Sequence, residues 1–303
     1  MRRWLWRAPE VALAACLAPL AVRVLFRDRV PSLAPLTYAT PLCVLAALAA
    51  LGWALAWRLE RRALGRVAGA LALVLGLWTV AANVSLHPLA QPGRYRGLLW
   101  NIEAGKRGWE RVAEQVRAED PDVAAFIDVG HKPGIRSPAL KRALPDSEIY
   151  DWNDALAIAV RGRIVHSFYY PLGTASHAGV ARVELADGRR LTVVIVHPRS
   201  APTESRAGVF KALADVLEPL RSEPLLVVGD FNTPSDSVYF DPIRREFHSA
   251  FETAGMGYAA SWPMPVPLLA IDQVWSTDSV PIRSCHLSGS LASDHRLVAF
   301  SFD

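Results

Sequence analysis

The sequence predicts an α+β domain with a two-layered sheet core flanked by helices, preceded by an all-α membrane region. The first 84 residues contain long apolar runs without a charge, whereas the remainder alternates short apolar runs with helical patterns. Asp187-Gly188 separates two of the short apolar runs and predicts a hairpin. Hairpins in a chain of mixed strands and helices argue against a purely parallel, doubly wound sheet.

Three apolar segments in residues 1–86 are expected to be transmembrane helices. Leu36–Trp57 is 22 residues without a charge and Val67–Leu86 is another 20, each long enough to cross about 30 Å of hydrocarbon. Val11–Phe26 is shorter, and its Arg23 lies close enough to one end to snorkel to the interface. This segment also fits a cleaved signal peptide, but no small-residue cleavage site follows it and two further spans do. A retained anchor is therefore favoured.

Basic residues predict the orientation of these spans. They are concentrated before the first span and between the second and third, at Arg2, Arg3, Arg7, Arg58, Arg61, Arg62 and Arg66. The positive-inside rule makes those two segments cytoplasmic. Three spans then place the rest of the chain outside the cytoplasm, at the cell membrane, whereas two spans would leave it in the cytoplasm.

Charge and cysteine content limit the possible functions of the remainder. Residues 1–84 hold ten Lys and Arg against three Asp and Glu, a net charge of +7, whereas the rest holds 23 against 26, a net charge of −3. Non-specific nucleic-acid binding depends on a basic surface, so this acidic balance makes nucleic acid a less favoured partner. Cys285 is the one cysteine after residue 84, which excludes an internal disulfide framework there. The sequence gives no indication of the oligomeric state.

Residues 87–96 are expected to be a linker and residues 97–303 the soluble domain. Alternation and apolar runs predict strands at Gly97–Trp100, Val123–Ile127, Ala155–Val160, Val180–Leu185, Leu191–Val196, Leu225–Val228, Ile271–Trp275 and Leu297–Phe302. Helical spacing predicts helices at Trp109–Ala118 and Glu204–Leu220.

Polar side chains recur at or beside the ends of these strands. They are Asn101, Asp128, His197, Asp230, Asn232, Asp272, Asp294 and His295. A single Asp at a strand end is more often a turn former than a catalytic residue. A series of strand ends that all carry such residues is much harder to explain by turns alone. Residues at strand ends can lie together at one edge of the sheets although they are far apart in the sequence. Carboxylate, amide and imidazole groups together suit a hard metal ion and a phosphate.

The order of these residues resembles the endonuclease/exonuclease/phosphatase superfamily, over roughly residues 95–303. The motifs that carry the resemblance are Trp100-Asn101-Ile102, Asp128 after an apolar strand, His197 after a Val-rich strand, Gly229-Asp230-Phe231-Asn232, Ile271-Asp272 and Ser293-Asp294-His295. The resemblance implies a four-layered α/β/β/α sandwich of the DNase I type. With the preceding spans, the chain looks similar to the bacterial membrane-anchored subgroup that includes a glycopeptide-resistance protein.

The resemblance also implies a role for each residue. Asp128 and Asn101 would lie at a divalent metal, Mg²⁺ or Mn²⁺, and Asp294 would contribute directly or through water. Asp230 would orient or deprotonate the attacking water, and Asn232 would hold a phosphate oxygen. Asp272 would hydrogen-bond His295, which faces the phosphate, and His197 would hold phosphate or protonate the leaving oxygen.

The sequence departs from the family pattern in two places. Asp128 stands where the family usually has Glu, and Glu103 is a nearby substitute candidate for a metal ligand. Gln273 stands where the membrane-anchored subgroup commonly has His, which keeps hydrogen bonding but loses a titratable group. These departures leave open a non-catalytic binding or scaffolding homologue.

Residues outside the motifs are given simpler interpretations. The proline-rich loop that contains Trp262 is expected either to border a lipid substrate or to be an ordinary packed surface loop. Arg199 could bind a phosphate, but a solvent-exposed charge in a loop is the favoured interpretation. His131, His166 and His177 are expected to have ordinary structural or surface roles.

The leading functional hypothesis is a membrane-anchored metal-dependent phosphoric ester hydrolase. Its expected substrate is a phosphorylated or pyrophosphorylated lipid, because a membrane tether concentrates lipid head groups near the site. The alternatives are a nuclease that acts outside the cytoplasm and the non-catalytic homologue.

Overall fold

The computed structural model describes residues 6–87, 92–131 and 134–303. The chain divides into a helical unit, residues 1–84 with the short segment 202–205, and a sheet unit, residues 85–201 and 206–303. Of the expected linker, residues 88–91 lie outside the described residues, as do Arg2 and Arg3.

The helical unit contains α2 (Ala8–Leu25), α3 (Ala34–Ala39), α4 (Leu42–Arg58) and α5 (Arg62–Asn83). The expected continuous helix Leu36–Trp57 is instead two helices that meet at Thr40 and Pro41. A residue before proline avoids the helical region, and Pro41 is itself extended, with φ −60° and ψ 161°. By length and composition, two helices could span a membrane, α2 and α5, while α4 is a shorter apolar helix of 17 residues.

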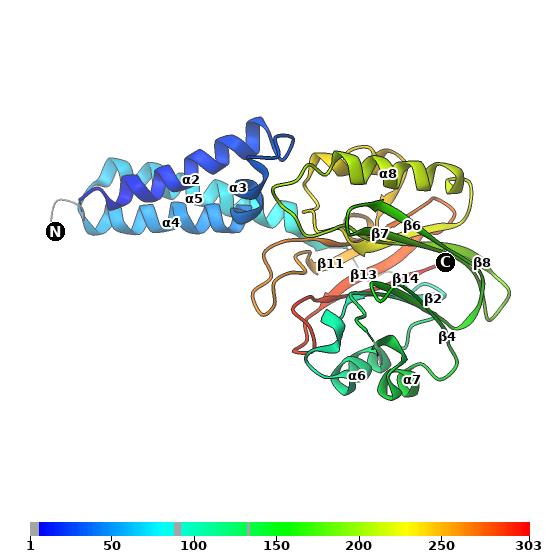
Figure 1. The fold of residues 1–303 in the computed structure, drawn as a ribbon. Coiled ribbons are helices and arrows are strands. Elements are labelled where there is room, and N and C mark those ends of the chain that lie inside the picture. Colours follow the sequence, from blue (N-terminus) through cyan, green and yellow to red (C-terminus); the bar gives the residue numbers. More distant parts are fainter. Residues whose placement is uncertain (1–5, 88–91, 132–133) are drawn as a thin grey trace. The chain divides into compact units, whose positions relative to one another are not determined.

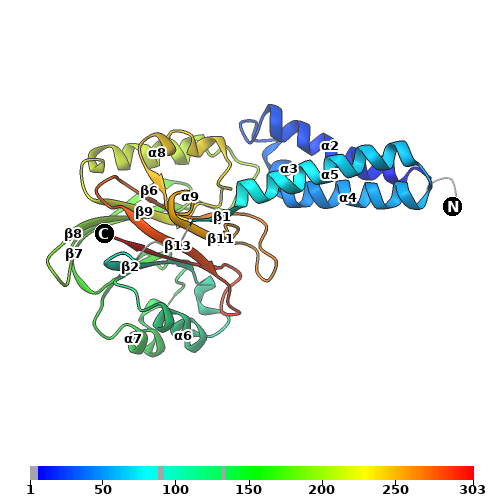
Figure 2. The same ribbon diagram turned by 180° about the vertical axis from the view of Figure 1, so that it is seen from behind.

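The sheet unit confirms the predicted sandwich of two stacked sheets. The first sheet has the order β1-β11-β13-β14-β2-β3-β5-β4 and the second β10-β12-β9-β8-β7-β6. Figure 1 shows α6 and α7 outside the first sheet and α8 outside the second, so four layers follow one another, and Figure 2 shows the same layers from behind.

The strands of the first sheet are β1 (Val84–Leu86), β2 (Tyr95–Asn101), β3 (Val123–Ile127), β4 (Glu148–Trp152), β5 (Leu156–Val160), β11 (Gly255–Tyr258), β13 (Ile282–Ser288) and β14 (Leu297–Phe302). Those of the second are β6 (Gly162–Gly173), β7 (Ser176–Leu185), β8 (Arg190–His197), β9 (Leu225–Asp230), β10 (His248–Ser249) and β12 (Asp272–Ser276). The helices are α6 (Trp109–Glu119), α7 (Pro138–Ala143), α8 (Ala207–Leu217) and α9 (Ala250–Ala254).

Two strands begin in segments that were expected to be a transmembrane helix and a linker. Helix α5 ends at Asn83, and Val84–Leu86, which was expected to finish the last transmembrane helix, is strand β1. β2 begins at Tyr95, inside the expected linker. The first sheet therefore starts earlier in the chain than residue 97.

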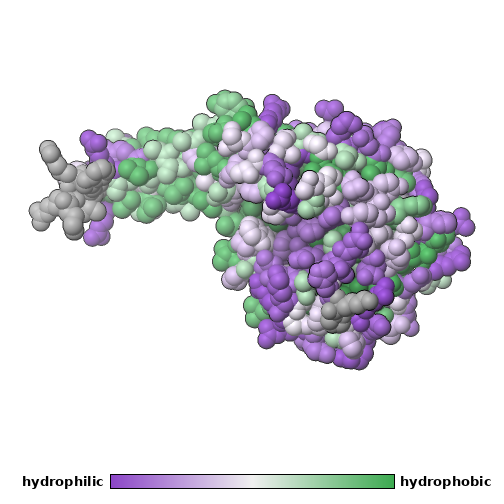
Figure 3. Space-filling view, viewed as in Figure 1, coloured by the Kyte–Doolittle hydropathy of each residue, from purple (hydrophilic) through white to green (hydrophobic). Residues whose placement is uncertain are grey.

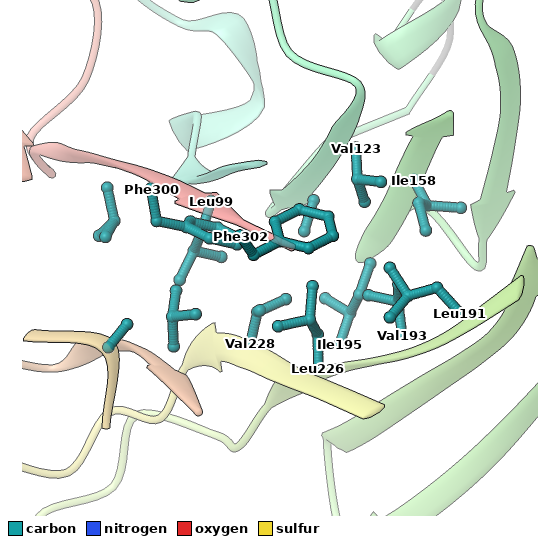
Figure 4. Close-up of a cluster of buried hydrophobic side chains, with 14 of the residues drawn as sticks. Leu99, Val123, Ile158, Leu191, Val193, Ile195, Leu226, Val228, Phe300 and Phe302 are labelled. Atoms are coloured by element: carbon teal, nitrogen blue, oxygen red, sulfur yellow. The ribbon is translucent and has the colours of Figure 1, made fainter. Parts of the chain in front are cut away.

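The core between the sheets comes from the inward-facing residues of both (Figure 4). Leu99, Phe300 and Phe302 from the first sheet meet Ile195 and Val228 from the second, and all five are at most 4% exposed. Alternate residues of the same strands face the outer helices, as Val194 and Val227 do toward α8. Because a strand presents its side chains alternately, this inner face also fixes which strand-end residues point between the sheets.

Candidate active site

The ends of strands from both sheets meet at a buried carboxylate, Asp230. Asp230 ends β9 and is 1% exposed, and Asp272, which begins β12, lies directly across from it in the antiparallel pair. From the other sheet, Asn101 at the end of β2 donates its amide Nδ2 to Asp230 Oδ2 at 2.9 Å. This hydrogen bond joins the rims of the two sheets.

Gly229 explains how Asp230 comes so close to the neighbouring strand. A Cβ on Gly229 would lie 2.1 Å from the carbonyl oxygen of Val196 on β8, so only glycine fits there. Beyond Asp230, the chain turns at Asn232, whose φ of 47° is a left-handed conformation that Asn tolerates. The Asn232 N–H donates to Asp230 Oδ1 at 2.9 Å, so both carboxylate oxygens accept a hydrogen bond.

Asp272 and His295 form a buried pair beside Asp230. His295 Nδ1 lies 2.8 Å from Asp272 Oδ2, which assigns the Nδ1 proton to that hydrogen bond, and Nε2 lies 3.8 Å from Asp230 Oδ2. Burial by itself lowers the pKa of His295, but Asp272, Asp230 and Asp294 outweigh it and raise the pKa to about 9. Burial raises the pKa of the Asp272 carboxyl, yet the shared proton belongs on His295, because three carboxylates surround the imidazole.

Two buried serines hold these residues in place. Ser293 accepts from the His295 N–H at 3.1 Å and donates to the Asn101 carbonyl at 2.7 Å. Ser261 accepts from the N–H of Asp272 at 3.1 Å. Both serines are fully buried, and sequence reasoning gave neither a role, because they act through main-chain groups that leave no pattern of their own.

Asp294 forms another side of the site together with Trp262. Its Oδ2 accepts from the Trp262 indole N–H at 3.2 Å, and its Oδ1 lies 4.0 Å from His295 Nε2. The rings of Trp262 and His295 have centroids 6.4 Å apart. Trp262 therefore lies against the site, and its indole forms part of the wall. This position is compatible with both interpretations of its loop, a border for a lipid substrate and a packed surface loop.

The loops after β8 and β9 are tied together through Arg206, a second contribution that the sequence did not reveal. The Arg206 guanidinium is 4% exposed and donates to the carbonyls of Arg199 and Asn232 at 2.6 and 2.9 Å. Asn232 donates its side-chain Nδ2 to the Pro198 carbonyl at 2.9 Å. One N–H of the Asn232 amide, expected to hold a phosphate oxygen, is thus engaged beside His197.

Asp128 follows the strand next to Asn101. β2 and β3 are parallel with Asn101 opposite Ile127, so Asp128 lies one residue further along the same rim. Its φ is 51°, and its N–H donates to the Ala155 carbonyl at 2.8 Å. Glu103, the substitute candidate, uses its carboxylate on Arg107 at 3.0 Å, while its N–H donates to Asn101 Oδ1 at 3.1 Å.

Oxygen atoms dominate the side chains that could hold a metal. Asp230, Asp272 and His295 each offer a ligand atom, and these atoms lie within 4.8 Å of one another. Asp272 Oδ1 is buried and accepts no hydrogen bond from any residue that the structure describes. With Asn101, Asp128 and Asp294 on the same rim, this donor set fits Mg²⁺ or Mn²⁺, which prefer carboxylate and amide oxygens.

The structure therefore brings most of the predicted site residues together. Hydrogen bonds or ion pairs connect Asn101, Asp230, Asn232, Asp272, Asp294 and His295. His197 and Asp128 are placed on the rim by strand register. His197 lies one residue beyond Val196, which pairs with Gly229, so His197 and Asp230 are at the same height on neighbouring strands.

Comparison with known proteins identifies the family. Residues 98–295 match the Endonuclease/Exonuclease/phosphatase family. Among curated proteins, none matches this chain.

Solved structures share the fold of the sheet unit. An endonuclease/exonuclease/phosphatase from Bacteroides vulgatus superposes with a TM-score of 0.57 at 17% identity, over 69% of this chain and 98% of that one. A mannosyl-6-phosphatase of Bacteroides thetaiotaomicron gives 0.56 at 15%, over 69% and 99%. The catalytic domain of human Nocturnin gives 0.55 at 19%, over 71% and 94%. Members of this family are typically hydrolases that act on phosphate esters and generally depend on a divalent metal. By its sequence match and its sandwich fold, the chain belongs to the endonuclease/exonuclease/phosphatase family.

Proposed function

We propose that the chain is a membrane-anchored phosphoesterase that depends on Mg²⁺ or Mn²⁺ and hydrolyses a phosphate ester or pyrophosphate of a lipid. The observation that carries the proposal is the buried series Asn101, Asp230, His295 and Asp272, linked by contacts of 2.9, 3.8 and 2.8 Å. Burying ionisable groups costs folding free energy. The burial of three ionisable side chains at one rim, in a member of a hydrolase family, is best explained by a role in catalysis.

The proposed reaction is an in-line displacement at phosphorus. Asp230 orients a water molecule and accepts its proton, since each carboxylate oxygen has lone pairs beyond those that accept from Asn101 and Asn232. A new P–O bond forms to the water oxygen as the bond to the leaving oxygen breaks. His197 gives its proton to that leaving oxygen.

His295 faces the phosphate from the buried side of the site. Asp272 holds its Nδ1, so Nε2 points toward Asp230 and the reacting groups. Asn101, Asp128 and Asp294 would hold the metal, which when bound polarises a phosphoryl oxygen and offsets the negative charge of the substrate. The metal roles of Asn101 and Asp294 rest on their match to the family motifs. That of Asp128 rests on its place on the same rim, since the family usually has Glu at this position.

Exposed apolar surface supports the membrane part of the proposal. Only 33% of the apolar window of α2 and 17% of that of α5 is buried, whereas a core helix of a soluble protein is mostly buried. Large side chains such as Val11, Leu73 and Leu77 are more than 60% exposed, and Figure 3 shows hydrophobic residues over much of the helical unit. Such surface is costly in water and favourable in lipid.

A substrate panel tests the proposal. The full chain in detergent, with Mg²⁺ or Mn²⁺, is incubated with lipid pyrophosphates, phospholipids and DNA, and released phosphate or product is measured. Hydrolysis of a lipid phosphate by the wild type and loss of that activity in Asp230→Ala are expected. Hydrolysis of DNA alone would instead favour the nuclease, and activity that survives Asp230→Ala would contradict the assigned mechanism.

A further inference from the structure

A row of polar side chains continues the rim beyond His197, one strand at a time. His197 on β8 pairs directly with His177 on β7. Tyr169, on the next strand β6, brings its hydroxyl to 2.5 Å from His177 Nδ1. Paired residues of neighbouring strands point to the same face, so the two imidazoles lie side by side on the inner face.

This row extends away from Asp230 across the second sheet. Neighbouring strands are about 4.8 Å apart, so β6 lies about 10 Å from β8. The strands in this part of the rim are held in place, because the ring of Trp152 from the first sheet covers Gly179, the residue opposite Tyr169. A Cβ on Gly179 would lie 2.8 Å from that ring. The row is longer than a phosphate alone requires.

The hydrogen bond between Tyr169 and His177 determines which groups the row offers to a ligand. A phenol O–H that donates to Nδ1 leaves the imidazole proton on Nε2, as a donor. The phenol oxygen keeps lone pairs and can accept. His177 is neutral in this arrangement, and burial, followed by the neighbouring His197, lowers the pKa of His177 below its usual value.

We propose that His177 and Tyr169 bind a hydroxyl-bearing part of the substrate, such as a glycerol or sugar group, that is joined to the phosphate held at Asp230. The proposal rests on the proposed function for the position of the phosphate. A neutral N–H donor beside a phenol oxygen complements an alcohol, which both donates and accepts. A second phosphate would need cations in this row, and a plain hydrocarbon would leave both polar groups without partners.

Matched ligands and matched variants test this inference. Glycerol 3-phosphate and propyl phosphate differ only in two hydroxyl groups. Their binding to the full chain in detergent with Mg²⁺ is measured by isothermal titration calorimetry, for the wild type, Tyr169→Phe and Tyr170→Phe. Tyr170 is the control, because it is on the same strand, is 39% exposed against 36% for Tyr169, and pairs with Ala178 on the opposite face.

The wild type and Tyr170→Phe are expected to bind glycerol 3-phosphate about threefold to tenfold more tightly than propyl phosphate, and Tyr169→Phe to lose that preference. His177→Gln, which keeps an N–H near the position of Nε2, is expected to retain part of it. Equal binding of both ligands by the wild type, or a preference that survives Tyr169→Phe, would overturn the proposal. Because binding is measured directly, a wild type with the preference but without hydrolysis would contradict the proposed function and leave this subsite supported.

Discussion

Asp272 shows how a single buried side chain sets the chemistry of its neighbour. One of its oxygens holds His295 Nδ1, and its other oxygen, Oδ1, has no hydrogen-bond partner among the described residues. An unpaired buried carboxylate oxygen is costly unless a cation or substrate group uses it. The pairing with His295 and the open oxygen both support the catalytic use proposed for Asp272.

Replacing Asp272 with Asn is expected to lower kcat about 100-fold to 10,000-fold with little change in KM. The Asn amide can donate to Nδ1, which would put the imidazole proton on the wrong nitrogen. Steady-state kinetics of the full chain measure this. Asp215→Asn is the control, because Asp215 is an exposed partner of Lys211 on α8. A loss of less than about fivefold in Asp272→Asn would show that the pair does not position His295.

At the scale of elements, the contact between β8 and β9 sets the geometry of the rim. Gly229 lets the two backbones approach, and Arg206 ties together the loops that follow them. His197 and Asp230 therefore keep their relative positions through main-chain contacts. Neither contact involves the side chains that are proposed to be catalytic.

Gly229→Ala is expected to destabilise the protein and to impair catalysis. Its Cβ would overlap the Val196 carbonyl, and overpacking of this kind costs about 1–3 kcal/mol. Thermal unfolding followed by intrinsic fluorescence should show a Tm lower by roughly 2–10 °C. Gly208→Ala is the matched control: a Cβ there meets no atom within 4 Å, and alanine in helix α8 should leave the Tm equal or slightly higher. Equal Tm values for the two variants would disprove the close-contact explanation.

The sequence predicted the fully buried strands beside site residues better than the more exposed strands. β3 and β14 have the predicted limits, because buried strands are continuous apolar runs with a polar residue beside them. β6 and β13 were not predicted, since their residues are mostly exposed or mixed and show no clear alternation. The helix break at Pro41 had a signal in the sequence, the proline itself, within an otherwise uniform apolar run.

The site shows the same division between what the sequence reveals and what it does not. Asp230, Asp272 and His295 could be located because they flank apolar runs, Asp230 at the end of one and Asp272 and His295 at or before the start of others, within recognisable motifs. Ser293 and Arg206 could not, because they bind main-chain carbonyls, of Asn101 for Ser293 and of Arg199 and Asn232 for Arg206, which leave no side-chain pattern in the sequence. Whether side chains from distant strands converge is decided by register, which only the folded sheets provide.

For the whole molecule, the three-span topology expected from the sequence predicts on which side of the membrane the sheet unit lies. Single cysteines are placed at Asp278, whose side chain is 94% exposed, and at the exposed Ala63, which lies among the basic residues between the second and third expected spans. A membrane-impermeant maleimide should label Asp278→Cys in intact cells and Ala63→Cys only after permeabilisation. The native Cys285 and Cys16 are buried and should add little background, and the partly exposed Cys43 is replaced by Ser in both variants. The reverse pattern would place the sheet unit in the cytoplasm.

Metal dependence of activity tests most directly whether these strand ends form one hydrolytic centre. Phosphate release by the full chain is measured after treatment with EDTA and during titration with Mg²⁺, for the wild type, Asp230→Asn and Asp294→Asn. Activity should disappear with EDTA and return with Mg²⁺ in the wild type. Asp230→Asn should stay inactive, and Asp294→Asn should need at least about tenfold more Mg²⁺. Phosphate release that is indifferent to EDTA, or equal in the wild type and Asp230→Asn, would contradict the account.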